Sequence, residues 1–445
     1  MKVAFIRPYM PIGGSEKLVL DTCLALQKKG HSCTIFCTEY DPKKAFDELK
    51  SNQVQVRRKF IWFPHSFFGR FVGLFSAFRV CLVAIYILFF QWFKYDAYFV
   101  DLCSACVPIL RLTRKPVLFY CHFPDKLLRD TGRGKSLHKK RGGFIDRGYR
   151  LIMDKIEYFG MKTASCIVAN SQYTKGVIHK TFPSLPLSKI SVIYPPVNMP
   201  PKPTEILHHI PKEPDSFIDY EHKKDLWETS SFILSSINRI VPEKRHDVSI
   251  HALRYVKDHS HDIYSSSVLI IGGGCKPDNI EEFHRLQGLA KTLDVDSHVI
   301  FAPNFSDSDK SAIFSRTTCG LYPPRYEHFG IVPIEFMSQE ICVVCDATGG
   351  PCESVGADKR GGLLVSTVVG ESVAVSGQKF GRAVLSVLEM KDSEREHMGI
   401  EGKKRVDEHF GMDLYGSNIL LLLEQKMSHV EVDLRKDYDA VDSTE

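Results

Sequence analysis

The chain has little excess charge and no long uninterrupted apolar run, and we expect no signal sequence in its first residues. Its 445 residues carry 58 Lys and Arg against 53 Asp and Glu, a formal net charge of +5. A balance this mild excludes a nucleic-acid-binding protein with a dominant basic face. Only four apolar residues separate Lys2 from Arg7, too few for the core of a signal peptide.

The cysteines do not follow a zinc or disulfide spacing. The chain has 13 of them, irregularly placed and mostly inside apolar runs, which is typical of reduced cysteines buried as small hydrophobic residues. Cys103 and Cys106 form a single CxxC pair without the second pair that a zinc site needs. We therefore expect no metal ion and no cofactor.

Strand-like and helix-like segments alternate through most of the chain. Buried strands are predicted near residues 1–7, 34–37, 95–101, 116–121, 166–171, 190–197, 232–239, 267–274, 299–301 and 318–322. This alternation predicts an α/β fold with two doubly wound parallel sheets. We expect a first domain over 1–200, a linker or insert over 201–228 and a second domain over 229–410. A C-terminal helix and a disordered acidic tail are expected over 411–445.

Two glutamates eight residues apart mark the most informative stretch, Glu327 to Glu335, with Phe329-Gly330-Ile331 between them. A predicted strand precedes it, and apolar residues at helical spacing follow from 334 to 344. Backbone N–H groups at such a helix start, with the helix dipole, form an anion site. Carboxylates accept pairs of hydroxyl protons, so the two glutamates suit sugar or ribose diols beside a diphosphate. The alternative, that Glu335 only complements the helix dipole and Glu327 is a solvated loop residue, stays open from this stretch alone.

Further polar residues follow predicted strand ends. Arg239 ends the predicted strand at 232–239 and Lys244 follows it, and the two could neutralise a diphosphate. His122 ends the strand at 116–121, where ligands of open α/β sheets bind, although a turn histidine satisfied by the backbone would look the same. Gly13-Gly14 opens the first helix and lacks the GxGxxG form, but it lets a ligand approach the backbone.

An apolar segment at 71–93 is long enough to cross a bilayer, but Arg79 and Gln91 interrupt it. The uninterrupted part, Val80 to Phe90, is too short to span. We favour a buried or membrane-surface helix, with a true span as the alternative. The flanking Arg57-Arg58-Lys59 and the aromatic residues after it are typical of an interfacial segment, so membrane contact is expected either way.

A basic segment follows His122. Lys126 to Arg150 holds nine Lys and Arg against two Asp, with several glycines and few apolar residues. We expect a mobile loop that is either a solvated surface or a contact for an anionic acceptor or lipid.

Taken together, these motifs resemble the retaining glycosyltransferases of the large GT4 family, which have the GT-B fold of two Rossmann-like domains facing a cleft. The resemblance covers about residues 1 to 410. It rests on Gly13-Gly14-x-Glu16, His122, Asn170-Ser171, Arg239 with Lys244, Glu327-x7-Glu335 and Gly349-Gly350-Pro351. The stretches FYCHFPD, NSQYT, SINR, YEHFGIVPIE and TGGPCES are similar to those of the mannosyltransferases that add the second and third mannoses to the dolichol-linked oligosaccharide precursor.

This resemblance implies a substrate pair and a location. The donor would be GDP-mannose, and the acceptor a mannosyl-chitobiosyl group on dolichol diphosphate at the cytosolic face of the endoplasmic reticulum membrane. One enzyme would make both the α-1,3 and the α-1,6 linkage, with other mannosyltransferases of the pathway as further partners.

The resemblance also implies residue roles. Glu335 would hold the ribose and Glu327 the donor sugar. Arg239, Lys244 and the backbone N–H groups of Phe329, Gly330 and Ile331 would hold the diphosphate. Gly13 and Gly14 would let the donor approach, and His122 would contact the transferred sugar.

Transfer from an α-linked donor to an α-linked product retains configuration, and two mechanisms can do this. Glycosidases use a close carboxylate pair and a covalent intermediate. Here both glutamates are committed to donor hydroxyls, so we favour a front-face reaction in which the departing diphosphate takes the acceptor proton. Asp307-Ser308-Asp309 has the DxD form of metal-dependent transferases, but its place before a helix favours a capping role.

Two other interpretations remain. A different nucleotide-sugar enzyme of the same architecture, such as an epimerase or a glucose-transferring relative, would share the glycines and cations. A non-catalytic membrane scaffold with a degenerate GT-B fold would share the fold alone.

Overall fold

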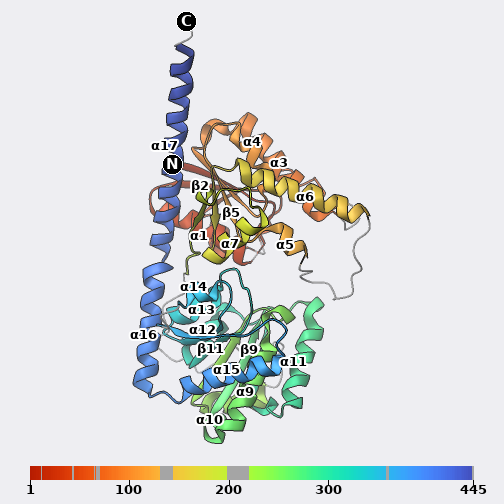
Figure 1. Cartoon of the computed structure of the whole chain (residues 1–445), viewed down its shortest axis with the longest axis vertical. Helices are drawn as coiled ribbons and strands as arrows, with labels where there is room; N and C mark the ends of the chain where they lie inside the picture. The colour runs from red at the N-terminus through yellow and green to blue at the C-terminus, as the bar shows by residue number, and fades with distance from the viewer. Residues whose placement is uncertain are drawn as a thin grey trace. The chain divides into compact units, whose positions relative to one another are not determined.

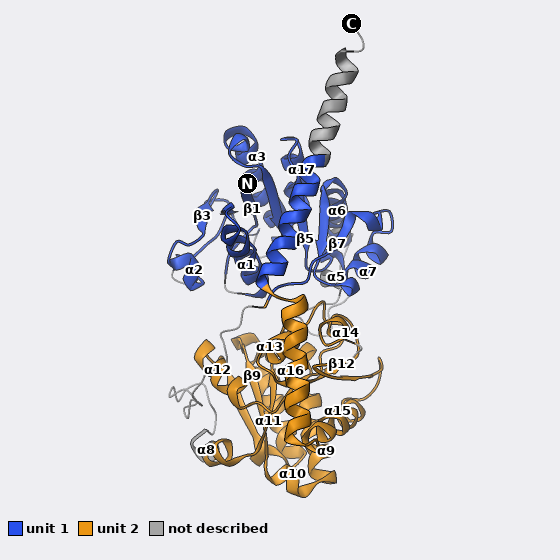
Figure 2. Cartoon of the chain, turned by 90° about the vertical axis from the view of Figure 1, so that its left-hand side faces the viewer, with its two compact units in different colours: residues 1–196, 412–445 blue, residues 197–411 orange. Residues whose placement is uncertain are grey.

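The computed structural model describes residues 1–11, 13–42, 45–64, 66, 71–130, 144–197, 220–356 and 360–442. The chain forms two compact units, coloured separately in Figure 2. The first comprises Met1–Pro196 together with Met412–Glu445, and the second is Val197–Gly411. Each unit is a parallel sheet with helices on both faces, so the predicted α/β class with two doubly wound domains is confirmed (Figure 1).

The sheet of the first unit has seven parallel strands in the order β3-β2-β1-β4-β5-β6-β7. Their bounds are β1 (Lys2–Ile6), β2 (Ser32–Cys37), β3 (Gln55–Arg58), β4 (Ala97–Asp101), β5 (Val117–Cys121), β6 (Cys166–Ala169) and β7 (Ile190–Val192). The central strands are apolar on both faces, as expected for a sheet covered on both sides.

Helices of the first unit cover the two faces of this sheet. They are α1 (Gly14–Lys28), α2 (Asp47–Lys50), α3 (Val72–Phe90), α4 (Val107–Arg111), α5 (Asp125–Asp130), α6 (Phe144–Thr163), α7 (Gln172–Thr181) and α17 (Met412–Asp442). Short 3-10 turns add η2 (Trp92–Lys94), η3 (Ser104–Cys106) and η4 (Leu187–Lys189). One core lies between the sheet and helices α1 and α17, and the other holds residues of α3, α4, α6 and α7.

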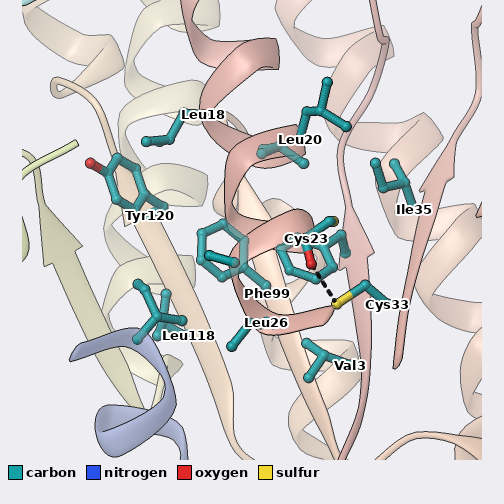
Figure 3. Packing of buried hydrophobic residues seen from close by; sticks show 14 of the residues in the cluster. Val3, Leu18, Leu20, Cys23, Leu26, Cys33, Ile35, Phe99, Leu118 and Tyr120 are labelled. Carbon is teal, nitrogen blue, oxygen red and sulfur yellow. Dashed lines mark hydrogen bonds between the residues drawn. The ribbon is translucent and has the colours of Figure 1, made fainter. Parts of the chain in front are cut away.

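Alternation along the strands divides the side chains between these cores. Val3 and Phe5 of β1 belong to the α1 core, while Ala4 and Ile6 belong to the α3 core. Figure 3 shows Leu18, Leu20, Cys23 and Leu26 of α1 against Val3, Ile35, Phe99, Leu118 and Tyr120 of the sheet. Burying each such aliphatic side chain contributes about 1.5–3 kcal/mol.

The second unit has six parallel strands in the order β10-β9-β8-β11-β12-β13. Their bounds are β8 (Phe232–Ile237), β9 (Ser267–Gly273), β10 (Val299–Pro303), β11 (Cys319–Tyr322), β12 (Cys342–Asp346) and β13 (Gly362–Val365). The helices are α8 (Tyr220–Thr229), α9 (His246–His259), α10 (His261–Ser265), α11 (Ile280–Thr292), α12 (Asp307–Arg316), α13 (Ile331–Ser338), α14 (Pro351–Ser354), α15 (Val373–Leu388) and α16 (Asp392–His409). The 3-10 turns are η5 (Pro242–Lys244), η6 (Pro277–Asn279) and η7 (Asp296–His298).

Helices α9, α11 and α15 pack in the main core of this unit. Helix α15 approaches α9 closely because it carries two glycines one turn apart. A Cβ on Gly377 would lie 2.1 Å from His251 Cβ, and a Cβ on Gly381 would lie 2.3 Å from Tyr255 Cβ.

Several local predictions differ from the structure. The segment expected to stay helical to residue 344 ends its helix, α13, at Ser338, and Cys342–Asp346 form the buried strand β12. β-branched Val343 and Val344 in a short apolar run suit a strand buried on both faces, which periodicity alone does not separate from a helix. The DxD segment caps α12: Ser306 accepts from Asp309 N, and the Asp309 carboxylate accepts from Ser306 N.

Two segments predicted to be irregular are helical. Residues 220–228 of the expected linker belong to α8 (Tyr220–Thr229), which is anchored by the buried Trp227 under the Arg316 guanidinium. Helix α17 continues to Asp442, although a disordered tail is expected there; no glycine or proline interrupts the sequence after Gly416. Most of the expected basic loop (131–143) and of the linker (198–219) lies outside the described residues.

Helix α3 corresponds to the apolar segment at 71–93. Among the described residues it is the one helix long and apolar enough to cross a membrane, with a mean hydropathy of 2.2. A third of its most apolar window is buried in the first unit, through residues such as Val80, Val83 and Ile87. Phe78, Phe89 and Phe90 are exposed.

Candidate active site

Both sheets reverse their strand order at one place, and polar residues gather there at the carboxyl ends of the strands. In the first unit the reversal lies between β1 and β4, and in the second between β8 and β11. Loops leaving such a pair diverge to opposite faces and leave a crevice, which is where ligands of open α/β sheets bind. The second unit places Arg239 and Lys244 after β8 and Glu327 after β11, at its reversal point.

Lys244 and Glu327 form an ion pair at this point. Lys244 Nζ lies 2.9 Å from Glu327 Oε1, and the lysine is 7% exposed. The Tyr322 hydroxyl donates to Glu327 Oε2 at 3.3 Å. Burial, followed by the nearby Glu327 carboxylate, raises the pKa of Tyr322, so its hydroxyl keeps the proton and serves as a donor. The sequence predicted Lys244 and Glu327 as site residues, but it did not identify Tyr322.

The loop that follows Glu327 packs against a second glycine loop. Gly350 N donates to Glu327 O at 2.7 Å, and Gly349 has a φ of +69°. A Cβ on Gly349 would lie 2.5 Å from Glu327 O, and a Cβ on Gly350 would lie 2.3 Å from Phe329 Cα. These glycines therefore let the two loops touch backbone to backbone, which fixes the carbonyl of Glu327.

Gly330 is the N-cap residue directly before α13 and has the left-handed conformation, with a φ of +81°. Phe329 is buried and packs edge-on against Phe410, and Ile331 is the first helical residue. Among the described residues, no side chain accepts a hydrogen bond from the first turn of α13 as an N-cap. The N-cap is a glycine and offers no side chain to these N–H groups, and their use as an anion site stays a prediction.

Glu335 lies in the second turn of α13 rather than in the first. Its Oε1 is 2.8 Å from Lys310 Nζ of α12, and both side chains are partly exposed. The carboxylate can still accept a further hydrogen bond, since each ionised carboxyl has about four lone-pair positions.

Arg239 is exposed, and its backbone carbonyl is hydrogen-bonded to the His246 ring. His246 Nε2 lies 3.2 Å from Arg239 O, and Nδ1 lies 2.9 Å from Ser236 Oγ. A carbonyl only accepts, so Nε2 carries the hydrogen and Nδ1 accepts from the serine. His246 is 1% exposed, and burial lowers its pKa to about 4. It is therefore a neutral structural support at neutral pH.

In the first unit, a buried arginine joins the ends of β1 and β4. Arg7 Nη2 lies 2.5 Å from Glu16 Oε1, and Nη1 lies 3.2 Å from Asp101 Oδ2. A Cβ on Gly13 would lie 2.4 Å from Glu16 Oε2, so this glycine makes room for the carboxylate. A Cβ on Gly14 would meet nothing within 4 Å, so packing does not require glycine there.

His122 follows β5 and contacts the same charge group. Its Nε2 donates to Asp101 Oδ1 at 2.8 Å, which leaves Nδ1 able to accept a hydrogen bond. Asn170 Nδ2 donates to His122 O at 3.2 Å, and Ser171 caps α7 through Thr174 N. The sequence predicted His122 and Gly13-Gly14, but it did not identify Arg7 or Asp101, although Asp101 ends a predicted strand.

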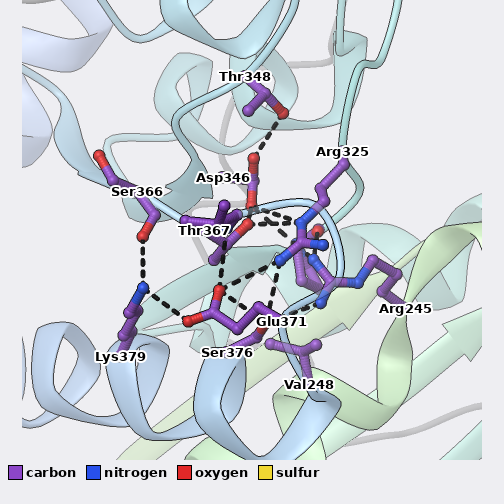
Figure 4. A network of polar contacts seen from close by, with 12 residues as sticks. Arg245, Val248, Arg325, Asp346, Thr348, Ser366, Thr367, Glu371, Ser376 and Lys379 are labelled. Atoms are coloured by element: carbon purple, nitrogen blue, oxygen red, sulfur yellow. Dashed lines mark hydrogen bonds and ion pairs between the residues drawn. The ribbon is translucent and has the colours of Figure 1, made fainter.

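A second network that the sequence did not reveal includes Arg245 and Arg325, which lie close in the chain to Lys244 and Glu327 (Figure 4). Its centre is Asp346, the last residue of β12, which is fully buried. Burial raises the pKa of this carboxyl above its usual value, and hydrogen bonds from Thr348 and Thr367 and the nearby arginines only partly offset that rise. The other members are Arg245, Arg325, Glu371, Ser376 and Lys379.

Comparison with known families identifies both halves of the chain. Residues 12–199 match the model of Glycosyltransferase Family 4, and residues 217–405 match the model of Glycosyl transferases group 1. The human α-1,3/1,6-mannosyltransferase ALG2 is 34% identical over 422 residues, which cover 93% of each chain. The protein of that name from Dictyostelium discoideum is 30% identical over 96% of this chain and 98% of its own. The expected resemblance is thereby confirmed.

Solved structures agree on the fold. Sucrose-phosphate synthase from Thermosynechococcus elongatus superposes with a TM-score of 0.68 at 16% identity, covering 96% of this chain and 99% of its own. Anabaena Alr3699/HepE in complex with UDP and glucose gives 0.65 at 17% identity, covering 95% and 99%. At these identities the likeness supports the two-domain glycosyltransferase architecture, and the chemistry has to be argued from the residues.

Proposed function

The chain belongs to the family of ALG2 α-1,3/1,6-mannosyltransferases, and from that membership we propose that it transfers mannose from GDP-mannose to a lipid-linked oligosaccharide. The acceptors are Man1GlcNAc2 and then Man2GlcNAc2 on dolichol diphosphate, joined through α-1,3 and α-1,6 linkages. The reaction belongs to the assembly of the N-glycan precursor. Family membership carries the proposal, and the structural observation that supports it is the Lys244–Glu327 pair at the strand-order reversal of the second unit.

The donor site of this proposal lies at that reversal. Lys244 and Arg239 hold the diphosphate, together with the backbone N–H groups of Phe329, Gly330 and Ile331. Glu327 accepts from hydroxyls of the transferred sugar, and Glu335 accepts from the ribose. The uncapped first turn of α13 and the buried position of Lys244 support this assignment.

In the first unit, Gly14 leaves space for the donor because nothing lies within 4 Å of the position of its missing Cβ. His122 contacts the transferred sugar through the ring nitrogen that Asp101 does not engage. Asp101 thereby fixes the orientation and tautomer of the imidazole.

Glu327 is poorly suited to attack the sugar. One of its oxygens is paired with Lys244 and the other accepts from Tyr322, and both contacts stabilise the carboxylate and lower its nucleophilicity. A front-face reaction needs no such attack. The bond from the anomeric carbon to the diphosphate oxygen breaks, and the acceptor oxygen forms a bond on the same face. The departing diphosphate takes the acceptor proton while Lys244 and Arg239 stabilise its charge.

The direct test combines purified protein with a phytanyl-linked Man1GlcNAc2 diphosphate and either GDP-mannose or UDP-glucose. We expect mannose transfer, with both linkages present in the product. Transfer from UDP-glucose alone would show a different glycosyltransferase, and isomerised nucleotide-sugar without transfer would show an epimerase. No turnover of either donor by folded protein would favour a non-catalytic scaffold.

The matched variants are Glu327→Gln and Glu340→Gln. Both residues are glutamates paired with a lysine, at 2.9 and 3.1 Å, but Glu340 precedes β12 at the amino edge of the sheet. We expect Glu327→Gln to lower kcat at least 100-fold with the fold intact, and Glu340→Gln to keep the wild-type rate. A mannosyl-enzyme trapped on Glu327 would overturn the front-face mechanism.

We further propose that α3 lies along the cytosolic surface of the endoplasmic reticulum membrane. Its buried face belongs to the core of the first unit, so a transmembrane position would require that core to open. Its other face exposes Phe78, Phe89 and Phe90, and Trp92 and Phe93 continue this apolar surface. Aromatic side chains are favoured at a bilayer interface.

Basic side chains border this surface: Lys59 Nζ lies 4.5 Å from the Tyr86 ring centroid, and Lys115 Nζ lies 5.6 Å from that of Trp92. Flotation with liposomes that contain anionic lipid tests the placement. Phe89→Glu with Phe90→Glu should abolish flotation, whereas Leu421→Glu should not. Leu421 is an exposed apolar residue of α17, the helix that covers the other face of the sheet. Unchanged flotation of the double variant would contradict the surface orientation.

A further inference from the structure

Two residues with unusual backbone conformations border the Lys244–Glu327 pair. Arg245, directly after Lys244, has a φ of +52°, and Tyr326, directly before Glu327, also has a φ of +52°. Residues with side chains rarely adopt this left-handed conformation, and they keep it only where surrounding contacts impose it. The placement of Lys244 and Glu327 therefore depends on whatever holds their neighbours.

The Asp346 carboxylate contacts Arg245 directly and Tyr326 through Thr348. Asp346 Oδ2 lies 3.8 Å from Arg245 Nη1. Thr348 Oγ1 donates to Asp346 Oδ1 at 2.5 Å and accepts from Tyr326 N at 2.9 Å. One oxygen thus contacts the residue after Lys244, and the other reaches the residue before Glu327 through a single threonine.

Arg325 adds a third connection on the same loop as Glu327. Its Nε lies 3.8 Å from Asp346 Oδ2 and donates to Thr367 Oγ1 at 2.6 Å, while Thr367 Oγ1 donates to that same Asp346 oxygen. Figure 4 shows Arg245 and Arg325 converging on Asp346 from neighbouring loops. Glu371 and Ser376 complete the pairing of the arginines, with Glu371 3.3 Å from Arg325 Nη2 and Ser376 Oγ 2.9 Å from Arg245 Nη2.

Stability of the fold alone is a weak explanation for a buried charged network. A buried carboxylate is costly unless it is paired, and apolar residues of similar volume would stabilise a core equally well. Asp346 contacts the two loops that carry the reacting-site pair, and both loops leave adjacent strands, β8 and β11. A rigid link between these loops fixes the distance from Lys244 to Glu327 before any donor arrives.

We propose that Asp346, acting through Arg245 and Thr348, is a positioning residue that holds Lys244 and Glu327 in register for the leaving diphosphate and the transferred sugar. The inference rests on the proposed function for its catalytic meaning. The positional link itself can be measured without turnover. The ion pair with Glu327 limits how fast the Lys244 amine reacts with a chemical label. If the link through Asp346 is broken, the pair should loosen and Lys244 should react faster.

The experiment uses the full chain and four variants. Asp346→Asn removes the charge, Thr348→Val removes the hydroxyl that reaches Tyr326 N, and Thr348→Ser restores it. Thr318→Val is the matched control, because Thr318 Oγ1 accepts from Ile233 N at 3.1 Å, the same kind of bond at the amino edge of the same sheet.

The first readout is acylation of lysines by an N-hydroxysuccinimide ester, followed by mass spectrometry. The rate at Lys244, whose side chain is 9% exposed, is divided by the rate at the surface residue Lys403. We expect this ratio to rise at least fivefold in Asp346→Asn and Thr348→Val, and to return to the wild-type value in Thr348→Ser. It should stay unchanged in Thr318→Val.

The second readout is mannose transfer at saturating donor. We expect kcat to fall at least tenfold in Asp346→Asn and Thr348→Val, with KM for GDP-mannose within threefold of wild type. A wild-type labelling ratio in both variants would overturn the inference, even if their melting temperatures fall. If the wild-type protein transfers no mannose, the proposed function fails, and the labelling ratio still decides whether Asp346 positions the pair.

Discussion

Acid should weaken the second unit through one buried imidazole. His246 is 1% exposed, and its pKa is lowered from 6.5 to about 4 by burial. The folded state therefore binds this proton less readily than the unfolded chain. The stability that the neutral ring contributes is complete above pH 6.5 and is lost as the pH falls toward 4. The full difference of 2.5 pH units corresponds to about 3 kcal/mol, and about 2 kcal/mol of it is already lost at pH 5.

The variant His246→Gln tests this value, because glutamine can still donate to Arg239 O but does not titrate. At pH 7.5 the variant should be less stable by about 1–2 kcal/mol, the contribution of an altered buried hydrogen-bond pair. Between pH 7.5 and pH 5 the wild type should lose about 2 kcal/mol of unfolding free energy that the variant keeps. At pH 5 the variant should therefore be about as stable as the wild type or more stable.

Urea unfolding followed by tryptophan fluorescence can report on the second unit alone. The chain has three tryptophans, and Trp227 is the one in the second unit, where it is buried. In a background with Trp62→Phe and Trp92→Phe, the fluorescence change comes from Trp227. Other titrating groups cancel in the difference between wild type and variant. If the free energies of unfolding of wild type and His246→Gln fell by the same amount between pH 7.5 and 5, the reasoning would be refuted.

Three further changes have definite expected outcomes. Gly14→Ala should leave the melting temperature unchanged, since a Cβ there meets open space, but raise KM for GDP-mannose several-fold; an unchanged KM would contradict donor contact. Burial raises the pKa of Asp21 to about 6, so its charged form opposes folding at neutral pH. Asp21→Asn should therefore stabilise the protein at pH 7.5 by up to about 3 kcal/mol. This gain should vanish near pH 4 in thermal melts, and a gain that persists there would argue against the assignment. Gly381→Ala places a Cβ 2.3 Å from Tyr255 Cβ and should cost about 1–3 kcal/mol by urea titration, whereas a neutral result would mean that the α9–α15 contact yields easily.

The α/β architecture could be predicted from the sequence because short apolar runs alternate with amphipathic segments. Strand ends were also visible, so Lys244, Glu327 and His122 could be recognised as candidates. Which strand ends lie side by side is not visible, since it depends on the order in which the strands enter the sheet. The pairing of Arg7 with Asp101 therefore had no signal in the sequence, although both residues lie at strand ends.

The missed network has a more specific cause. The sequence predicts that the helix continues into the run before Asp346, because α13 and β12 are separated by only three residues and both are apolar. Once Cys342–Asp346 is recognised as a strand, Asp346 becomes a carboxylate at a carboxyl edge, the same signal that identified the other candidates. The left-handed Arg245 and Tyr326 had no comparable signal, since neither is a residue type that favours a positive φ.

The return of α17 to the first unit has a consequence for how the protein is made. Tyr415 bonds to Thr22, at 2.7 Å, and Ile419 and Leu423 complete the core beneath α1. A ribosome therefore finishes the whole second unit, Val197–Gly411, before it supplies the helix that the first unit needs. A chain truncated after Gly411 and released from the ribosome should have a folded second unit and a first unit with an uncovered apolar face, which makes it a substrate for chaperones.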